Sequence, residues 1–359
     1  MDIEERLNLI KDVGEEIITE QDLIKLLKEK KRFITYDGFE PSGTNIHIGQ
    51  GLLRAINVNK MIKAGAHFKM LVADWHGWAN NKMGGDLERI QKVGQFYIDV
   101  WKACGMDLKN VEFIWASDLL NNRDYWKTVM QIARNSTLKR IIRCGQIMGR
   151  RENEVLQASQ IFYPCMQCAD IFHLKADITQ LGMDQRKVNM LAREIGPKIG
   201  YWKPVVVSHH MLMGLQKPVS KEKDILERTI ELKMSKSKPK TAIFMTDTKE
   251  EIINKITDAW CPEKEVKENP ILEYCRYIIF EKVDSIEIKR PEKWGGNLTI
   301  KSYRQLEEIY EKGELHPLDL KKEVAKKINM LVSPAREQIL TNPKTKELYE
   351  EIKKYEVTR

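Results

Sequence analysis

Two short stretches of the chain combine residues that suit the binding of a polyphosphate. His47 and Gly49 stand where a strand-like segment leads into an amphipathic helix, and Lys233 and Lys236 lie three residues apart in a polar loop. The first turn of a helix has unpaired N–H groups and favours an anion, to which an imidazole can add a hydrogen bond. Ammonium groups on flexible stems suit phosphate oxygens. Each stretch alone is more often an ordinary helix start or a solvated lysine run.

A third stretch indicates a small polar pocket. The segment 161–172, IFYPCMQCADIF, is apolar on nearly every side and therefore predicts a buried helix. Tyr163, Gln167 and Asp170 follow one another at spacings that place them on one face of that helix. Burying an amide and a carboxylate is costly unless each finds a partner, either in the protein or in a ligand. Three such groups on one face, near Asp184 and Gln185, favour a ligand.

The elements that must position these residues alternate between strand and helix. Strand-like segments cover 33–36, 68–74, 111–117, 176–181 and 205–209, with helical segments between them, including 52–64, 87–104 and 187–195. This alternation predicts a parallel sheet covered on both faces, with ligands beyond the carboxyl ends of its strands. Residues 1–30 predict a helical extension, 31–230 a catalytic domain, 231–245 a polar loop and linker, and 246–359 a smaller, mostly helical domain.

Composition excludes some classes of protein. Apolar residues make up 42% and charged residues 31% of the chain, as in soluble globular proteins. No apolar run approaches the length of a membrane helix, and the first residues lack the layout of a signal peptide, so we expect a cytoplasmic protein. The net charge of +8 permits a polyanionic partner. Cys165 and Cys168 form a single C-x-x-C without a second pair, so no metal site is predicted.

The motifs together resemble a known enzyme family. H-I-G followed by K-M-S-K-S resembles the HIGH and KMSKS signatures of class I aminoacyl-tRNA synthetases, although Gln50 replaces the second histidine. YDGFEPSG, ADWH, YPxMQxxDI, GMDQRK, KMSKS and HPLDLK occur in the order found in tyrosyl-tRNA synthetases of the archaeal and eukaryotic type. The likeness runs from about Phe33 to beyond Leu320. It implies a Rossmann-like α/β catalytic domain with inserted helices and a mostly helical C-terminal anticodon-binding domain.

The resemblance also implies roles for individual residues. For tyrosine, it implies phenol contacts from Tyr36 and Asp170, α-amino contacts from Tyr163, Gln167 and Gln185, and further pocket lining from Asp74 and His76. For ATP, it implies His47 and Gly49 at the phosphates and adenine, Gly182 and Asp184 at the ribose, Lys233 and Lys236 at the pyrophosphate, and Gln50 and Ser235 as further ATP-binding residues. His47, Lys233 and Lys236 would be catalytic. For tRNA, it implies Arg143 and Arg186 at the acceptor stem, and Trp294 and Asp319 at the anticodon.

The expected activity is the ligation of tyrosine to tRNA(Tyr). L-tyrosine and ATP, with Mg²⁺, would form tyrosyl-adenylate and pyrophosphate, and the tyrosyl group would then pass to the 3′-terminal adenosine of the tRNA. The resemblance implies a homodimer. Alternatives are the tryptophan enzyme, an adenylyltransferase with an H-x-G-H site, and a catalytically silent relative that only binds RNA. Without the resemblance, Trp294 reads as a core residue and Asp319 as a helix N-terminal acid.

Overall fold

A six-stranded sheet forms the centre of the molecule. The computed structural model describes residues 1–148, 156–218, 225–236 and 238–357. The strand order is β1-β6-β5-β2-β3-β4. The strands are β1 (Gly14–Ile18), β2 (Phe33–Phe39), β3 (Ala66–Val72), β4 (Val111–Trp115), β5 (Ile178–Thr179) and β6 (Val205–His209). All neighbours pair in parallel except β1, which is antiparallel to β6. The predicted parallel sheet is confirmed.

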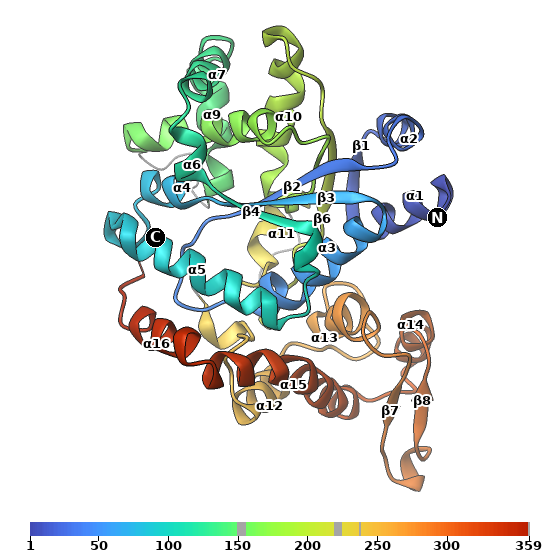
Figure 1. The fold of residues 1–359 in the computed structure, drawn as a ribbon. Coiled ribbons are helices and arrows are strands. Elements are labelled where there is room, and N and C mark those ends of the chain that lie inside the picture. Colours follow the sequence, from blue (N-terminus) through green and yellow to red (C-terminus); the bar gives the residue numbers. More distant parts are fainter. Residues whose placement is uncertain (149–155, 219–224, 237, 358–359) are drawn as a thin grey trace.

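Helices cover both faces of this sheet (Figure 1). On one face lie α3 (Arg54–Lys63) and α5 (Leu87–Ala103); on the other lie α7 (Arg123–Arg134), α9 (Ala158–His173) and α10 (Arg186–Ile195). Short helices α4 (Asp74–Ala79), α6 (Ala116–Leu120) and α8 (Leu138–Cys144) connect them. Successive side chains of a strand point to opposite faces. Accordingly Met70 of β3 joins the core cluster beneath the sheet, whereas Leu71 joins the cluster with α9.

The predicted site residues gather where the strand order reverses. β2 lies between β3 and β5, so the chain leaves the carboxyl ends of these neighbouring strands in opposite directions. Such a switch point is where open α/β sheets bind their ligands. Tyr36 lies on β2, Asp74 follows β3 and Gly182 follows β5. The topology alone therefore brings three separate sequence segments to one edge.

The N-terminal segment differs from the all-helical expectation. It contains α1 (Ile3–Val13) and α2 (Glu20–Glu29), but between them lies strand β1, which the sequence reasoning missed. The strand has only five residues, two of them glutamates, and it pairs with β6 nearly the whole catalytic segment away. A short, charged edge strand has little local signal because its partner is distant in sequence.

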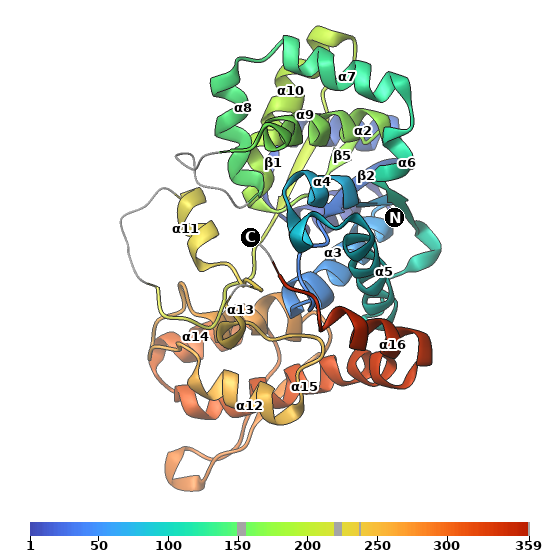
Figure 2. The same ribbon diagram turned by 90° about the vertical axis from the view of Figure 1, so that its left-hand side faces the viewer.

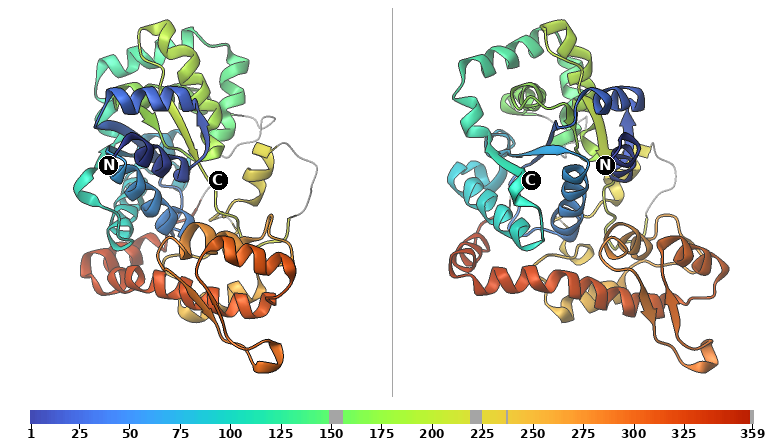
Figure 3. Two further views of the ribbon diagram at one scale, coloured as in Figure 1. Left: turned by 90° about the vertical axis from the view of Figure 1, so that its right-hand side faces the viewer. Right: turned by 45° about the vertical axis from the view of Figure 1, so that its right-hand side comes forward.

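The C-terminal part is mostly helical, as predicted, and carries one hairpin. Its helices are α12 (Lys249–Asp258), α13 (Pro270–Tyr274), α14 (Tyr303–Lys312), α15 (Pro317–Thr341) and α16 (Pro343–Ile352). The hairpin of β7 (Ile286–Ile288) and β8 (Leu298–Ile300) projects away from them (Figure 3). Helix α11 (Ile225–Leu232) lies between α8 and α10 on one side and this C-terminal part on the other (Figure 2). Among the described helices, none has the length and apolarity needed to cross a bilayer. The domain boundary at residue 246 stays a prediction.

Candidate active site

The two residues predicted to bind the phenol, and one predicted to line the pocket, lie together in a buried cluster. Tyr36 comes from β2, His76 from α4 and Asp170 from α9, and all three side chains are buried. His76 Nε2 lies 3.0 Å from Asp170 Oδ2. This distance suits an ion pair but the geometry is not that of a hydrogen bond, so within the described residues Asp170 Oδ2 has no hydrogen-bond partner. Besides this ion pair, Oδ2 can still accept a hydrogen bond from a ligand, because a carboxylate oxygen has more than one lone pair.

The electrostatics of this cluster follow from burial and from the Asp170 carboxylate. Burial, together with the nearby carboxylates of Asp170 and Asp37, raises the pKa of the Tyr36 phenol well above its ordinary value. Burial alone would lower the pKa of His76, but the adjacent Asp170 raises it above the usual value. Tyr36 therefore stays a neutral hydroxyl that can donate and accept, and the Asp170 carboxylate favours the protonated form of the His76 imidazole.

The residues predicted to hold an α-amino group are also brought together. Gln167 Nε2 donates to Gln185 Oε1 at 3.0 Å, and Gln185 Nε2 donates to the Ile147 carbonyl at 3.1 Å. The Tyr163 ring meets the His76 ring edge-on, with centroids 5.0 Å apart. Burial and the nearby Glu40 carboxylate, which accepts a hydrogen bond from Tyr163, raise the pKa of the Tyr163 phenol well above its ordinary value. The site thus presents amide oxygens and a carboxylate, which are acceptors for an ammonium group.

Asp74 differs from its neighbours because protein groups occupy its carboxylate. Oδ1 accepts from the backbone N–H groups of Trp75, at 3.0 Å, and Ser117, at 3.1 Å. Oδ2 accepts from Gln91 Nε2 at 2.9 Å. The side chain is fully buried. These contacts hold the start of α4 against α5 and α6, so protein groups fix the orientation of the Asp74 carboxylate, and its place in the tyrosine pocket stays a prediction.

The H-I-G stretch forms a preorganised donor at a helix start. The helical segment begins with a π-turn, Gly49–Leu53, that continues into α3. His47 Nδ1 accepts from the Gln50 backbone N–H at 3.3 Å, so the ring proton resides on Nε2, from which it can be donated to a phosphate. Burial and the cations of the KMSKS lysines keep the pKa of His47 well below its ordinary value. The imidazole is therefore neutral.

The absence of a side chain at Gly49 leaves space for the His47 imidazole. A Cβ on Gly49 would lie 3.2 Å from His47 Nδ1 and 3.3 Å from Leu212 Cβ, both tighter than ordinary contacts. The glycine thus lets the histidine ring fold back over the turn. Gln50 Oε1 is buried and, in the part of the chain that the structure describes, has no hydrogen-bond partner. Gln50, which replaces the second histidine of the signature, therefore has a buried amide oxygen that no group of the described residues satisfies.

Two predicted parts of the nucleotide site contact each other directly. Lys233 Nζ donates to Asp184 Oδ2 at 2.6 Å, which joins the KMSKS loop to the turn after β5. Burial alone would raise the pKa of Asp184, but Lys233 lowers it below the usual value. A Cβ on Gly182 would lie 2.4 Å from Met211 Sδ and 2.8 Å from Asp184 Oδ1. A larger residue at this position would therefore have to displace the Met211 or Asp184 side chain.

The second KMSKS lysine rests on a buried tyrosine. Lys236 Nζ donates to the Tyr97 hydroxyl, which in turn donates toward the carbonyls of Gly43, at 2.9 Å, and Asn45, at 3.1 Å. A Cβ on Gly43 would lie 2.6 Å from Lys236 Cδ. Burial is the main cause that lowers the pKa of Lys236 to about 7. Ser235 lies between the two lysines, and Ser237 falls outside the described residues.

The predicted acceptor-stem arginines lie on neighbouring elements. Arg143 is exposed near the end of α8, and Arg186 begins α10. Arg186 Nε donates to both carboxylate oxygens of Glu16 on β1, at 3.0 and 2.8 Å. An acidic partner from the N-terminal strand thus faces this guanidinium.

The predicted anticodon residues lie at the far end of the molecule. Trp294 is 65% exposed in a short turn, Glu292–Trp294, between β7 and β8, which excludes the alternative that it is a core residue. Asp319 lies in the first turn of α15, where a carboxylate is favourable in any case. Arg290 links the two regions by donating to the Gly296 carbonyl at 2.7 Å and the Glu314 carbonyl at 2.6 Å.

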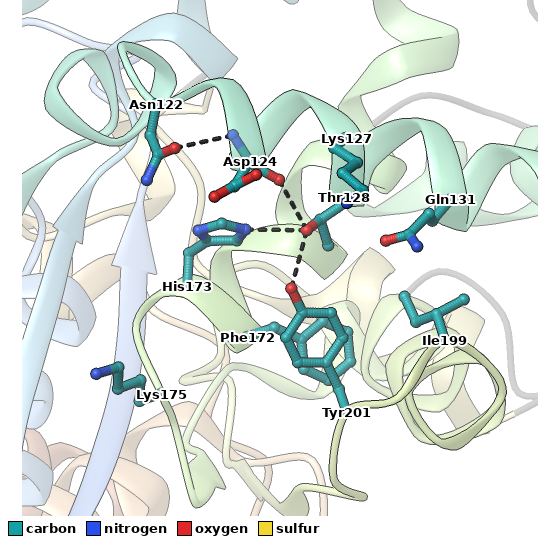
Figure 4. A pocket seen from close by; sticks show the side chains of 10 residues that line it. All are labelled: Asn122, Asp124, Lys127, Thr128, Gln131, Phe172, His173, Lys175, Ile199 and Tyr201. Atoms are coloured by element: carbon teal, nitrogen blue, oxygen red, sulfur yellow. Dashed lines mark hydrogen bonds between the residues drawn. The ribbon is translucent and has the colours of Figure 1, made fainter.

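Two surface cavities among the described residues are not lined by the predicted site residues. A surface cavity of about 470 Å³ lies between α7 and the end of α9 (Figure 4). There the Thr128 hydroxyl contacts His173 Nε2 and the Tyr201 hydroxyl, each at 3.0 Å. A second cavity, of about 390 Å³, lies beside α1 and His210. Within the described residues no cluster of three or more potential ligands could hold a metal ion.

Four residues near these sites were missed by the sequence reasoning. They are Tyr125, which contacts Asp170; Glu40, which contacts Tyr163; Tyr97, which contacts Lys236; and Glu16, which contacts Arg186. Each makes its contact across a long sequence separation. Only Glu40 lay inside a recognised motif, YDGFEPSG, so a closer look at that motif could have found it.

Comparison with known proteins places the chain in a family. Residues 28–333 match the family described as "tRNA synthetases class I (W and Y)", and the chain belongs to it. The chain is 50% identical to cytoplasmic tyrosine–tRNA ligase 1 of Arabidopsis thaliana, over 100% of this chain and 90% of that protein. It is 42% identical to tyrosine–tRNA ligase of Thermococcus kodakarensis, over 98% and 99% of the two chains.

A solved structure gives the same result in three dimensions. Tyrosyl-tRNA synthetase of Pyrococcus horikoshii, complexed with L-tyrosine, superimposes with a TM-score of 0.90 at 40% identity, covering 98% of this chain and 100% of that one. The resemblance inferred from the motifs, to the archaeal and eukaryotic type of tyrosyl-tRNA synthetase, is confirmed.

Proposed function

We propose that this chain binds the phenol of tyrosine in the buried cluster of Tyr36, His76 and Asp170, activates the amino acid with ATP and then transfers it to tRNA(Tyr). The ligase activity is that of its relatives at 41–50% identity over nearly its whole length. The observation that carries the residue assignment is that, within the described residues, Oδ2 of the fully buried Asp170 has no hydrogen-bond partner, with the neutral hydroxyl of Tyr36 in the same cluster.

That arrangement suits a phenol better than an indole or a phenyl ring. The phenol hydroxyl of tyrosine would donate to Asp170 Oδ2 and accept from Tyr36. Phenylalanine would leave both protein groups without a partner, and sites built around a substrate hydroxyl reject analogues that lack it. Tryptophan offers one N–H donor and no acceptor. The pocket therefore supports tyrosine over the tryptophan alternative.

The first chemical step needs alignment and charge neutralisation more than proton transfer. The carboxylate of tyrosine is ionised at neutral pH, so it attacks the α-phosphorus of ATP without a general base, and pyrophosphate leaves. His47 Nε2 and the KMSKS lysines would hold the phosphates as negative charge develops. Asp184 would accept hydrogen bonds from the ribose once Lys233 leaves it for the phosphates. These roles account for the contacts seen between Lys233 and Asp184.

Mg²⁺ fits this site only as a companion of ATP. The described residues build no carboxylate cluster for a metal ion, and Mg²⁺ is commonly held by phosphates, waters and few protein ligands. Bound to the phosphates, the ion would neutralise part of their charge. The residues of this chain would do the rest by binding the α-, β- and γ-phosphates with His47, Lys233 and Lys236.

The second step joins the amino acid to RNA. The 3′-terminal ribose hydroxyl of the tRNA attacks the carbonyl carbon of the adenylate, and AMP leaves. We assign Arg143 and Arg186 to the acceptor stem, and Trp294 and Asp319 to the anticodon. The exposure of Trp294 supports this role because unpaired bases stack on accessible aromatic rings.

We further propose a cytoplasmic homodimer. Three exposed apolar side chains on α7, α8 and α9 support a dimer interface on these helices. They are Met130, Leu138 and Phe162. Isolated exposed apolar residues are common, so the assembly itself must be measured. Sedimentation equilibrium of the purified chain should give twice the mass of 42.0 kDa.

The test of the function is pyrophosphate exchange into ATP, run separately with each amino acid. Tyrosine should give a far higher kcat/KM for exchange than any other amino acid, with phenylalanine supporting only weak exchange at high concentration, and tRNA charging with tyrosine should follow. Exchange driven by tryptophan would identify the alternative enzyme. RNA binding without any exchange would identify a silent relative.

A further inference from the structure

The Asp170 carboxylate accepts a hydrogen bond from Tyr125, a residue that does not belong to any of the recognised motifs. The hydroxyl of Tyr125 donates to Asp170 Oδ1 at 2.7 Å, and the Met166 carbonyl lies 3.1 Å from the same hydroxyl. Tyr125 is 0% exposed, as is Asp170. A hydroxyl has one proton, so the shorter contact with the charged carboxylate is the favoured one. The carboxylate thus has one oxygen that accepts from Tyr125 and one that faces His76 and can still accept a hydrogen bond from a ligand.

Tyr125 is itself fixed on its other side. Its ring packs against the ring of His173, with centroids 5.2 Å apart. His173 Nε2 contacts the Thr128 hydroxyl at 3.0 Å, and that hydroxyl also donates to the Asp124 carbonyl at 3.0 Å (Figure 4). Tyr125 and Thr128 lie on α7, whereas His173 and Asp170 lie on α9, so the contacts tie the two helices together. The phenol of Tyr125 therefore has little freedom to turn away.

We propose that Tyr125 is a specificity-determining positioning residue, which holds Asp170 Oδ1 so that Oδ2 points at the hydroxyl of the bound tyrosine. This role of Tyr125 rests on the proposed function and adds a residue to the same site. Without the Tyr125 hydroxyl, the carboxylate could rotate and share both oxygens with His76, whose Nε2 already lies 3.0 Å from Oδ2. Tyrosine would then lose its acceptor, while phenylalanine, which needs none, would lose nothing.

The test compares Tyr125→Phe with the wild type in pyrophosphate exchange driven by tyrosine and by phenylalanine. We expect kcat/KM for tyrosine to fall roughly tenfold to a hundredfold, mainly through KM, because a hydrogen bond to a buried charge is removed. We expect kcat/KM for phenylalanine and KM for ATP to stay within about twofold. The matched control is Tyr310→Phe, which removes a buried hydroxyl bonded to the Pro262 carbonyl, at 2.8 Å, in the C-terminal part.

The selectivity between the two amino acids separates positioning from general damage. A structural defect would lower exchange with tyrosine and phenylalanine together, and such a parallel loss would overturn the proposal. So would an unchanged selectivity. In the Asp170→Asn background, Tyr125→Phe should have less than about a threefold further effect, because it acts through that carboxylate. Full additivity of the two changes would also reject the role.

Two further readings keep the outcome decisive. If Tyr125→Phe does not fold, Thr128→Val serves instead, because it removes the hydroxyl that holds His173 against the Tyr125 ring. This variant should reduce the ratio of kcat/KM for tyrosine to that for phenylalanine about two- to fivefold. An unchanged ratio would overturn the proposal. If the wild-type protein shows no exchange with tyrosine, the proposed function fails and this inference falls with it. If the wild type exchanges and only the variants disagree, the function stands and the role of Tyr125 does not.

Discussion

Lys236 shows how a single buried side chain can link ATP binding to proton uptake. The amine lies over the Tyr97 ring, 4.5 Å from its centroid, and burial is the first cause of its pKa of about 7. Glu40 opposes this shift, whereas the cations of Arg54 and Lys82 add to it. At pH 8.5 the amine is therefore mostly neutral in the ATP-free protein. The phosphates of ATP favour its charged form.

Binding of ATP at pH 8.5 should accordingly take up about one proton per site, because phosphate contacts would return the pKa of Lys236 toward the ordinary lysine value. Calorimetric titration in buffers of different ionisation enthalpy measures the uptake. Lys236→Arg keeps a cation that never loses its proton and should abolish the uptake. Equal uptake by the wild type and this variant would contradict the assignment.

At the scale of elements, the sequence predicted the parts that have a strong local pattern. The parallel strands β2, β3, β4 and β6 and the helices between them are long or strongly apolar, so periodicity was sufficient. Strand β1 and the β7–β8 hairpin were missed because they are short and partly charged. The contacts of Tyr125 and Tyr97 were missed for a different reason: in the sequence each is one more apolar position of an amphipathic helix. Their partners are brought to them only by the tertiary fold.

The β7–β8 hairpin should matter for RNA and not for adenylate formation. Trp294 stands in its connecting turn, and the following Gly295 and Gly296 have φ values of 90° and 65°, which a residue with a side chain rarely adopts. Trp294→Ala should lower kcat/KM for tRNA charging by roughly tenfold, since base stacking on an aromatic ring is lost, while pyrophosphate exchange stays unchanged. Trp294→Phe, which keeps a stacking face, should retain most charging. Equal losses in both assays would argue against an anticodon role.

Strand β1 brings Glu16 onto Arg186, and this contact should oppose RNA binding. Both side chains are partly exposed, at 31% and 39% respectively, so the ion pair itself is weak. The glutamate nevertheless neutralises part of the charge of Arg186 and repels an approaching phosphate. Glu16→Gln should therefore tighten binding of tRNA about two- to fivefold in a filter-binding or fluorescence titration, with exchange unaffected. Arg186→Gln should weaken binding. Weaker binding in Glu16→Gln would show that the glutamate assists by orienting the arginine.

At the scale of the whole molecule, one histidine connects three parts of the chain. His210 follows β6, its Nδ1 lies 3.3 Å from Glu15 on β1, and its Nε2 lies 3.0 Å from Glu273 on α13. Its ring stacks on Tyr277 with centroids 4.2 Å apart. Burial alone would lower the pKa of His210, but the two glutamates raise it to about 9. The imidazolium thus joins the N-terminal strand, the central sheet and the C-terminal helices by charge.

This connection should make stability depend on alkaline pH. The pKa of His210 is raised above its unfolded value of about 6.5, so its contribution is fully present below pH 6.5 and is lost as pH rises through about 9. Between pH 6.5 and pH 10 the wild type should lose on the order of 2–3 kcal/mol of unfolding free energy more than His210→Gln, which carries no charge at either pH. Urea unfolding at both pH values measures the difference. The same pH dependence in both proteins would mean that the imidazolium does not hold the three parts together.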